Sequence, residues 1–526
     1  MNARPSLFLL AAALITASVS AQTTATTRTD RAFAEAKKAG APELYAFLKP
    51  FPKGADLHMH LSGAIYAETF LREAAAEGLC VDSEELKLTT VKPPCKKPLM
   101  LAEDVLADQP LYDKLIDAFS MRSFVPYASW SGHDQFFATF SKWSALEKSV
   151  AGEWLDEVAT RAATQNEQYL EIMQTPPFGH AAGLGYKIGW PKGSEESVTP
   201  QVLAGLRDEL LKAGVKEEVS VDEKDLVDAQ AKREEIEMCK SHVPLPPSPR
   251  KDRGYGAACE VKIHWIYQVL RGFSPQQVFA QTLLGFEVAS SDPDVVGINF
   301  VMPEDGRLSM RDYHLQMQML DYLHSVYPKV HITLHAGELA QGMVAPDGLT
   351  FHIREAVELG HAERIGHGVD VLYEDHPVEL LKELADKHID IEVNLTSNDG
   401  ILGIKGTNHP LTAYRAAHVP FSLSTDDEGV SRIDLTHEYV RAVTEQELTY
   451  EDLKASARNS LEHSFLHGES LYLHPDDYAH RIAACTAPVS AAKEPSADCQ
   501  HFLGANEKAA AQYELERRFL QFEAAH

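Results

Sequence analysis

The sequence predicts a (β/α)8 barrel that carries long insertions after its first and second strands. Eight short apolar runs, rich in β-branched and aromatic residues and flanked by glycine and proline, have the composition of buried strands. Helical patterns lie between the later runs. Strands that alternate with helices form a parallel sheet, and eight such strands are the number that closes a barrel.

The expected strands are distributed along most of the chain. They cover residues 55–58, 169–173, 261–266, 295–300, 330–335, 364–367, 389–394 and 420–424. The expected helices between the later strands cover residues 312–326, 351–359, 377–387 and 409–417. The expected strands are evenly spaced except between the first and second and between the second and third. The insertions are predicted at these two places.

The two insertions differ in composition. Residues 66–168 carry helical patterns rich in aromatic side chains, whereas residues 179–256 are charged and then proline-rich. A long segment of the second kind inside a compact domain belongs on the surface. We interpret it as a substrate lid or as the contact of a homodimer, and residues 22–526 as one barrel domain. Its helical patterns cover residues 201–213 and 222–240.

The amino terminus has the three parts of an export signal. Residues 1–4 carry a positive charge, residues 7–17 are apolar, and small residues precede a cleavage site after Ala21. The apolar stretch is shorter than the roughly 20 residues that a membrane span needs. We therefore expect residues 1–21 to be a signal peptide and the mature protein to be periplasmic or secreted.

The formal net charge of −28 argues against two classes of partner. A chain this acidic repels the phosphate backbone of nucleic acids and the surface of an anionic membrane. The expected partner is a small molecule.

Six cysteines in an exported chain favour disulfide bonds. They fall into three local pairs, and closing loops of this size stabilises a protein by roughly 3 kcal/mol each in the chain-entropy model. Free buried thiols are the alternative, and the absence of a C-x-x-C pair disfavours a cysteine-ligated metal. The predicted pairs are Cys80 with Cys95, Cys239 with Cys259, and Cys485 with Cys499.

Histidines and acids recur just after the predicted strands. The loop-facing ends of the strands build the active site of such a barrel. A lone histidine near a strand end is more often a satisfied polar residue than a ligand, but four of them with acids, at four strand ends, point to one site. Three histidines and one aspartate can hold a catalytic zinc and leave a position open for water. The sequence therefore predicts a metal-dependent hydrolase. The four blocks are residues 58–60, 335–338, 366–368 and 424–427.

Position along the chain indicates separate roles for these residues. His58 and His60 alternate along the first strand and so face the barrel interior together. Glu338, in the turn beyond the fifth strand, is placed to move protons on a substrate. Asp426 ends the eighth strand, where an oxygen ligand would complete the metal's shell, and Asp427 is left free to bind substrate. The structural alternatives are an acid in the first turn of a helix and a pair of acids in a solvated turn.

The blocks at residues 58–64, 335–338, 364–368 and 424–427 resemble the adenosine deaminase family of the amidohydrolase superfamily. The run at 52–58, the export signal and the early insertions are more similar to its secreted, growth-factor-related branch. The resemblance covers residues 52–471 and implies a (β/α)8 barrel with one zinc per chain. It implies these roles: His58, His60, His335 and Asp426 as zinc ligands, Glu338 as the proton shuttle to the ring, His367 as the group that orients the attacking hydroxide, and Asp427 as the partner of a purine nitrogen.

This chain departs from the family pattern at two positions. Ser62 stands where the family usually has an aspartate that contacts the sugar, and Met302 stands at about the place of a glycine whose backbone meets the purine ring. Residues 295–300 contain no lysine, which disfavours the two-metal sites that some relatives build on a bridging lysine. The departures concern the sugar and the base edge of the substrate and leave the chemistry intact.

The resemblance implies a zinc-dependent hydrolytic deamination of adenosine, or of a close 6-aminopurine nucleoside, to the inosine-type product and ammonia. Zinc lowers the pKa of bound water, Glu338 donates a proton to the ring nitrogen, and ammonia leaves. Two alternatives stay open. One is the same scaffold acting on another amino-heterocycle or amide. The other is a secreted binding or signalling protein without turnover, which the completeness of the motifs disfavours.

Overall fold

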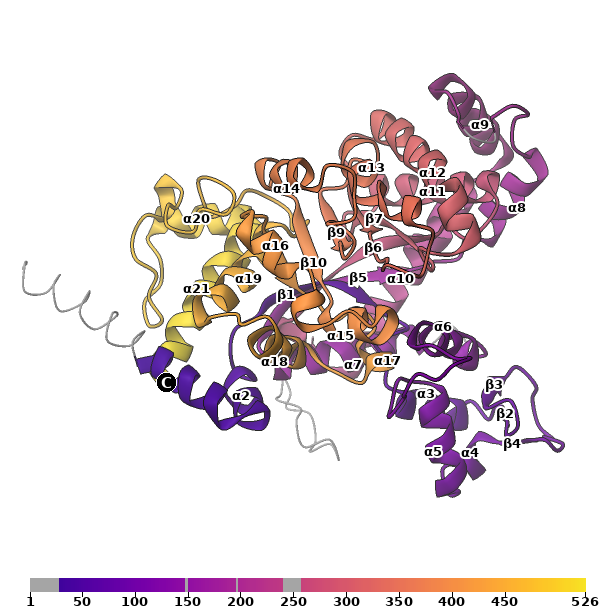
Figure 1. The fold of residues 1–526 in the computed structure, drawn as a ribbon, viewed down its shortest axis with the longest axis horizontal. Helices are drawn as coiled ribbons and strands as arrows, with labels where there is room; N and C mark the ends of the chain where they lie inside the picture. The colour runs from indigo at the N-terminus through magenta and orange to yellow at the C-terminus, as the bar shows by residue number, and fades with distance from the viewer. Residues whose placement is uncertain (1–27, 147–149, 195–196, 240–256) are drawn as a thin grey trace, which may run out of the picture.

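The computed structural model describes residues 28–146, 150–194, 197–239 and 257–526. Figure 1 shows their arrangement around a central barrel. The predicted signal peptide and the proline-rich run at 244–249 lie outside the described residues.

Parallel strands form the centre of the molecule and are neighbours in the order in which they follow one another along the chain. Every adjacent pair is parallel. This confirms all eight predicted strands and the predicted fold class. In the described part of the chain the barrel strands are β1 (Gly54–His60), β5 (Glu167–Gln174), β6 (Lys262–Leu270), β7 (Val295–Val301), β8 (His331–Ala336), β9 (Arg364–His367), β10 (Asp390–Val393) and β11 (Phe421–Leu423).

Asp426 joins the first strand of the barrel to the last. Its backbone N–H donates to the carbonyl of His58 at 2.8 Å, and the N–H of His60 donates to the carbonyl of Asp426 at 3.2 Å. Met59 and Asp426 form a parallel bridge between them. The seam of the barrel is therefore made by residues of the predicted metal site.

Helices cover the outside of the barrel between its strands. Helix α12 buries one face with Leu315, Met319 and Leu323, which recur every four residues and so lie along one side. The four helices predicted between the later strands are confirmed. The helices of this part are α11 (Pro275–Ser291), α12 (Arg307–Val326), α13 (His352–Glu358), α14 (Pro377–Asp386) and α16 (Leu411–Ala416).

The insertion after β1 contains helices, as predicted, and also a small antiparallel sheet that the sequence did not indicate. The strands of that sheet have three residues each, too few for an alternating pattern to be recognised. Cys80 on its central strand is bonded to Cys95. The elements are α3 (Ala67–Ala76), β2 (Cys80–Asp82), β3 (Lys87–Thr89), β4 (Leu99–Leu101), α4 (Ala102–Val105), α5 (Gln109–Ala118), α6 (Gly132–Trp143) and α7 (Ala151–Thr164).

The segment after β5 forms helices α8 (Gly179–Ile188), α9 (Pro200–Ala213) and α10 (Lys216–Ile236). Helix α8 packs against α11, and α10 packs against both α7 and α11. The hydroxyl of Tyr267 on β6 donates to Asp222 on α10 at 3.0 Å. Helix α10 is thus bound to the barrel wall, and the segment's role as a lid or a dimer contact stays a prediction.

The last helices pack beside the first. Helix α21 (Glu507–Ala525) lies against α19 (Tyr450–Glu462), and its Phe522 ring meets Phe47 of α2 (Ala41–Leu48) at 5.3 Å between centroids. Figure 1 shows α2 and α21 on the same side of the barrel.

The structure confirms the three predicted disulfides, which are Cys80–Cys95, Cys239–Cys259 and Cys485–Cys499. Among the described residues, no helix has the length and apolar character needed to cross a membrane.

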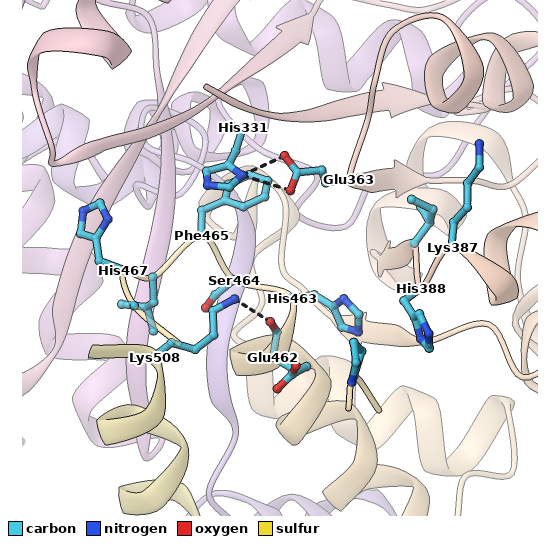
Figure 2. Close-up of a pocket in the computed structure, with 14 residues that line it drawn as sticks. His331, Glu363, Lys387, His388, Glu462, His463, Ser464, Phe465, His467 and Lys508 are labelled. Carbon is cyan, nitrogen blue, oxygen red and sulfur yellow. Dashed lines mark hydrogen bonds and ion pairs between the residues drawn. The ribbon is translucent and has the colours of Figure 1, made fainter. Parts of the chain in front are cut away.

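One cavity lies at the amino ends of the strands, away from the predicted site. It has a volume of about 470 Å³ and is lined by residues that precede or begin β8, β9 and β10, including His331, Glu363 and Ile389. Figure 2 shows His331 paired with the side chain of Glu363, and the amine of Lys508 donates to the backbone carbonyl of Glu462 at 2.8 Å. Polar contacts between neighbouring segments thus connect this end of the barrel.

Candidate active site

The structure brings all seven predicted site residues to the carboxyl ends of the barrel strands. His58, His335, His367 and Asp426 each present a ligand atom, and these four atoms lie within 4.8 Å of one another. The Nε2 atom of His60 lies 3.2 Å from Nε2 of His335 and 3.2 Å from Oδ1 of Asp426. Four histidines, where three were predicted as ligands, therefore surround one aspartate.

The backbone at two of these residues is in the left-handed region. The φ angle is 71° at His367 and 60° at Asp426. Aspartate and histidine tolerate this conformation better than most residues, and such strain collects at functional sites. Close approach also fixes Gly63, because a Cβ there would overlap the carboxylate of Asp427.

A buried carboxylate holds the ring of His58. Oε2 of Glu392 lies 2.6 Å from Nδ1 of His58, and Oε1 accepts from Arg364 at 2.6 Å. Burial alone would raise the pKa of Glu392, but Arg364 and the bond to His58 lower it to about 2. The carboxylate can only accept, so Nδ1 of His58 carries the proton and Nε2 has a free lone pair. Within the described residues, that Nε2 atom has no hydrogen-bond partner.

Side-chain amide oxygens lie beside Nδ1 of two more rings, as the carboxylate of Glu392 does at His58. Nδ1 of His335 lies 2.8 Å from Oδ1 of Asn299, whose amide nitrogen donates to the carbonyl of Thr333 at 3.1 Å. The carbonyl fixes the orientation of that amide, so His335 donates through Nδ1. Nδ1 of His60 lies 2.5 Å from Oε1 of Gln268. His335 therefore directs an Nε2 lone pair at the centre, whereas Nε2 of His60 is hydrogen-bonded to Asp426. A hydrogen-bond partner on Nδ1 of each ring is usual for metal-binding histidines.

The fourth ring has the opposite environment. Nδ1 of His367 lies 2.9 Å from the amide nitrogen of Asn398, a donor. The oxygen of Asn398 lies 3.0 Å from Nε2 of His409. Nε2 of His367 faces Oδ2 of Asp426 at 3.8 Å. His367 thus differs from the other three histidines in its hydrogen bonds and not in its distance from the centre.

Glu338 is positioned as a carboxyl that keeps its proton. The backbone N–H groups of Gly337 and Glu338 donate to Glu304 at 3.0 and 2.7 Å, which fixes the turn. Burial raises the pKa of Glu338 well above its usual value, and the charges of Asp426 and Glu304 raise it further. Its Oε1 lies 3.8 Å from Nδ1 of His367. A carboxyl that is neutral near pH 7 can donate a proton.

The two adjacent aspartates differ in charge. Burial would raise the pKa of Asp426, but the hydrogen bond with His60 holds it well below its usual value. Burial and the neighbouring Asp426 raise the pKa of Asp427 well above its usual value. The pair therefore supplies one anion at the centre and one neutral carboxyl beside it.

A cavity of about 420 Å³ opens on these groups. Its outer wall is aromatic and comes from α6 of the first insertion. No lysine or arginine is among the described residues that line it. The lining residues are His60, Ser62, Phe136, Phe137, Phe140, Thr175, Gln268, Leu270, Val301, Met302, Pro303, His335, Glu338, Asp426 and Asp427.

Both departures from the family pattern lie in this cavity. Ser62 and Met302 line it, and the side chain of Met302 is 37% exposed. The φ angle of Met302 is 126°, a conformation that glycine adopts easily and methionine rarely. The backbone at this position therefore keeps a shape suited to the glycine that the family usually has.

The partners of the four histidines were not predicted from the sequence. Glu392 and Asn299 left a weak signal, since each is a polar residue inside an apolar strand. Gln268 lies beyond the predicted end of its strand. Asn398 and His409 lie after β10, in a segment whose sequence carries no pattern that would bring them together.

The donor set fits a zinc ion. Three imidazole nitrogens and one ionised carboxylate match the ligands and the charge that zinc prefers. The unpartnered Nε2 of His58, buried at 0% exposure, supports this, because a buried polar atom without a partner is costly. The convergence of His60, His335 and Asp426 around it completes the set.

Residues 253–471 match the model of the adenosine deaminase family. Adenosine deaminases of Escherichia coli and Clostridium perfringens are 40% and 35% identical to this chain over 140 and 135 residues. Each match covers 26% of this chain, and 39% and 37% of the respective relative, so the chain spans well under half the length of these relatives.

A solved structure shows the same fold. An amidohydrolase from Burkholderia ambifaria with bound zinc aligns with 80% of this chain and 88% of its own, at a TM-score of 0.50 and 16% identity. The family match contains His335, Glu338, His367 and the aspartate pair, and the barrel brings His58 and His60 to them from outside that match. Residues 253–471, which hold most of the site, therefore match the adenosine deaminase family, and the barrel around them has the fold of the solved amidohydrolase.

Proposed function

We propose that this protein is a zinc-dependent hydrolase that converts adenosine, or a close uncharged 6-aminopurine nucleoside, to the inosine-type product and ammonia. One observation carries the proposal: a buried cluster of histidines around Asp426 lies at the floor of a cavity whose wall holds Glu338, a carboxyl that keeps its proton.

His58, His60, His335 and Asp426 are the proposed ligands of a single zinc. The hydrogen bonds of His58 and His335 leave Nε2 of each ring as a lone pair, His60 would give up its bond to Asp426 when the ion binds, and Asp426 supplies the negative charge. Bound zinc would make hydroxide available from water at neutral pH.

Proton transfer falls to the acids that do not hold the metal. Glu338 would protonate the ring nitrogen next to the carbon that is attacked, and this makes that carbon more electrophilic. Asp427, neutral because burial and Asp426 raise its pKa, would donate a hydrogen bond to another purine nitrogen. His367 would donate to the attacking oxygen.

The walls of the cavity favour a neutral substrate. Its charged lining residues are acidic, and none of the described lining residues is basic. A phosphate group would be repelled there and would find no cation to pair with. Phe137 and Phe140 offer faces on which a purine can stack. A nucleoside fits this site better than a nucleotide, in agreement with the adenosine deaminases that are similar to part of this chain.

An ammonia-release assay on the zinc-loaded protein tests the proposal. Adenosine and 2′-deoxyadenosine should be deaminated, and adenosine monophosphate should react with a kcat/KM lower by about 100-fold or more, since like charges at close range cost several kcal/mol. The proposal is wrong if no 6-aminopurine nucleoside releases ammonia, or if the nucleotide is the better substrate.

Two variants locate the substrate in the cavity. Phe140→Ala should raise KM for adenosine, whereas Leu106→Ala, on an exposed side chain outside the cavity, should leave KM unchanged. Ser62→Asp restores the residue usual in the family and should improve kcat/KM for adenosine relative to nucleosides with altered sugars. A panel in which Ser62→Asp changes nothing would remove Ser62 from sugar recognition.

We also propose that the protein is exported, as in the secreted branch that its sequence resembles. The three disulfides support an oxidising compartment. Mass spectrometry of the protein isolated from its native source should find Gln22 as the first residue. An intact amino terminus in a reducing compartment would contradict export.

A further inference from the structure

We propose that His409 and Asn398 are positioning residues that fix the proton of His367 on Nε2, so that His367 acts as a hydrogen-bond donor and neither as a metal ligand nor as a base. The inference rests on the proposed function for the role of that donor. The hydrogen bonds from Leu411 to His367 are independent of that function.

The chain begins at a group whose polarity cannot change. The backbone N–H of Leu411, at the start of α16, lies 3.2 Å from Nδ1 of His409. An N–H can only donate, so Nδ1 of His409 accepts and its proton is on Nε2. His409 is 1% exposed, and burial lowers its pKa to about 3, so the ring is neutral.

The tautomer of His409 determines the orientation of the side-chain amide of Asn398. Nε2 of His409 donates to Oδ1 of Asn398 at 3.0 Å, and this leaves the amide nitrogen of Asn398 directed at Nδ1 of His367, 2.9 Å away. The opposite orientation of the amide would require His409 to accept at both ring nitrogens, which a neutral imidazole cannot do. The orientation of Asn398 is therefore determined, although oxygen and nitrogen are alike in shape.

The orientation of Asn398 determines the tautomer of His367. Its Nδ1 accepts from Asn398, so its proton is on Nε2, the nitrogen that faces Oδ2 of Asp426 at 3.8 Å. An imidazolium is excluded by the same contact, because two N–H groups would then face each other. His58, with a carboxylate at Nδ1, has the reverse tautomer. Both rings lie close to the proposed metal position, but their hydrogen bonds make His58 suited to be a ligand and His367 suited to be a hydrogen-bond donor.

The role follows from this tautomer. Once three histidine lone pairs and Asp426 hold the ion, an N–H directed at the same centre can bind the attacking oxygen and stabilise negative charge that develops there. A hydrogen-bond donor aimed at such charge contributes about 10²–10³-fold in kcat. His409 and Asn398 touch no substrate and act only through His367.

Three variants separate polarity from shape. Asn398→Asp keeps the size of the side chain but offers an acceptor to His367, which moves the ring proton to Nδ1. His409→Gln keeps an N–H where Nε2 of His409 donates and serves as the matched control. His409→Met fills similar space but removes the donor.

The first measurement is the tautomer itself, by long-range ¹H–¹⁵N correlation of ¹⁵N-histidine-labelled protein, with the His367 signals assigned by their loss in His367→Asn. Wild type and His409→Gln should show an unprotonated Nδ1 and a protonated Nε2 at His367. Asn398→Asp should show a protonated Nδ1. A wild-type His367 with its proton on Nδ1, or a tautomer unmoved by Asn398→Asp, would overturn the inference.

The second measurement is kinetic. Asn398→Asp should lower kcat by about 100-fold with KM and the zinc content unchanged, His409→Met should also lose kcat, and His409→Gln should retain it. A merely structural role predicts equal losses of thermal stability and activity in the two His409 variants, and that result would also overturn the inference. If the wild type deaminates no nucleoside, the proposed function fails, while the tautomer measurement still decides on the chain from Leu411 to His367.

Discussion

At the scale of residues, hydrogen-bond polarity distinguishes side chains that distance alone does not. His58 and His367 belong to the same group of ligand atoms within 4.8 Å, yet one ring nitrogen faces a carboxylate and the other faces an amide N–H. The same reasoning applies to the acids. Asp426 is held ionised and Glu338 is held neutral, although both are buried at the same site.

A pair of substitutions tests the division between metal binding and proton transfer. Glu338→Gln should keep one zinc per chain and the fold, and should lower kcat by about 10²–10⁴-fold, because it preserves shape and removes the transferable proton. Asp426→Asn removes the anionic ligand and should lose zinc. Metal analysis beside kinetics on adenosine provides the measurement. A metal-free Glu338→Gln protein would move Glu338 out of the shuttle role.

Met302 offers a test of backbone conformation. A methionine at a φ of 126° is strained by about 1–3 kcal/mol. Met302→Gly should therefore raise the free energy of unfolding, or leave it unchanged despite the lost side chain, and should admit purines with larger substituents. Met302→Ala, which keeps the strain and loses the contacts, should be less stable than Met302→Gly. Denaturation curves that rank the alanine variant higher would contradict this account.

The sequence allowed the residues proposed to act in the reaction to be predicted, but not the residues proposed to orient them. His335, Glu338 and the aspartate pair could be predicted because each follows an apolar strand whose end faces the site. Asn398 and His409 could not, because their function depends on which hydrogen bonds form between loops in the folded protein. The left-handed backbone of Met302 is likewise a tertiary property.

At the scale of elements, the insertions shape the site and the strands support it. All eight barrel strands were predictable, since β-branched and apolar runs between turn residues identify buried parallel strands. The three-residue strands of the small sheet were not, and neither was the position of α6 over the cavity. Helix α6 carries Phe136, Phe137 and Phe140, and these aromatic residues, noted in the sequence only for their composition, form the outer wall.

The loop after α19 is attached to the amino end of the barrel by an acid between two histidines. Oδ1 of Asp476 lies 2.8 Å from Nε2 of His463, and its Oδ2 lies 2.7 Å from Nδ1 of His388. Both histidines appear at the edge of the cavity in Figure 2. Burial would lower the pKa of His463, but the bond to Asp476 raises it overall; burial would raise the pKa of Asp476, but His463 lowers it overall.

The stability that this pair contributes should depend on pH. For His463 it is fully present below the ordinary value of 6.5 and is lost as pH rises through the raised pKa. For Asp476 it is present above 3.8 and is lost as pH falls through the lowered pKa. Asp476→Asn should therefore cost about 1–2 kcal/mol of unfolding free energy near pH 6 and less near pH 9. Asp477→Asn, on an exposed pair with His480, serves as the control. An equal loss at both pH values would show that charge is not involved.

At the scale of the whole molecule, one barrel combines strands from residue 54 to residue 423 with disulfides that bind its peripheral loops. The pairing of the cysteines could be predicted from their short separations, because local pairs need no knowledge of the fold. The packing of α2 against α21 could not, since it joins segments at opposite ends of the described chain.

Removal of zinc should destabilise the whole domain. A ligand that binds only the folded state adds about 4 kcal/mol when its free concentration is a thousand times its dissociation constant. Chelation should lower Tm, and added zinc, but not magnesium, should restore it, because imidazole ligands favour zinc. Calorimetry of Asp426→Asn gives the control, since its Tm should respond little to the chelator. A wild-type Tm that is the same with and without chelator would argue against a structural link.

The seam of the barrel leads us to expect that zinc binding and the stability of the fold are linked. The backbone of Asp426 binds the backbones of His58 and His60, and the side chains of the same three residues are proposed to hold the ion. The ligands from the first strand and the ligand after the last one come together only when the two edges of the sheet have met. Metal uptake would thus report the completion of folding, and a chain that stalls with its seam open would be recognisable as a metal-free one.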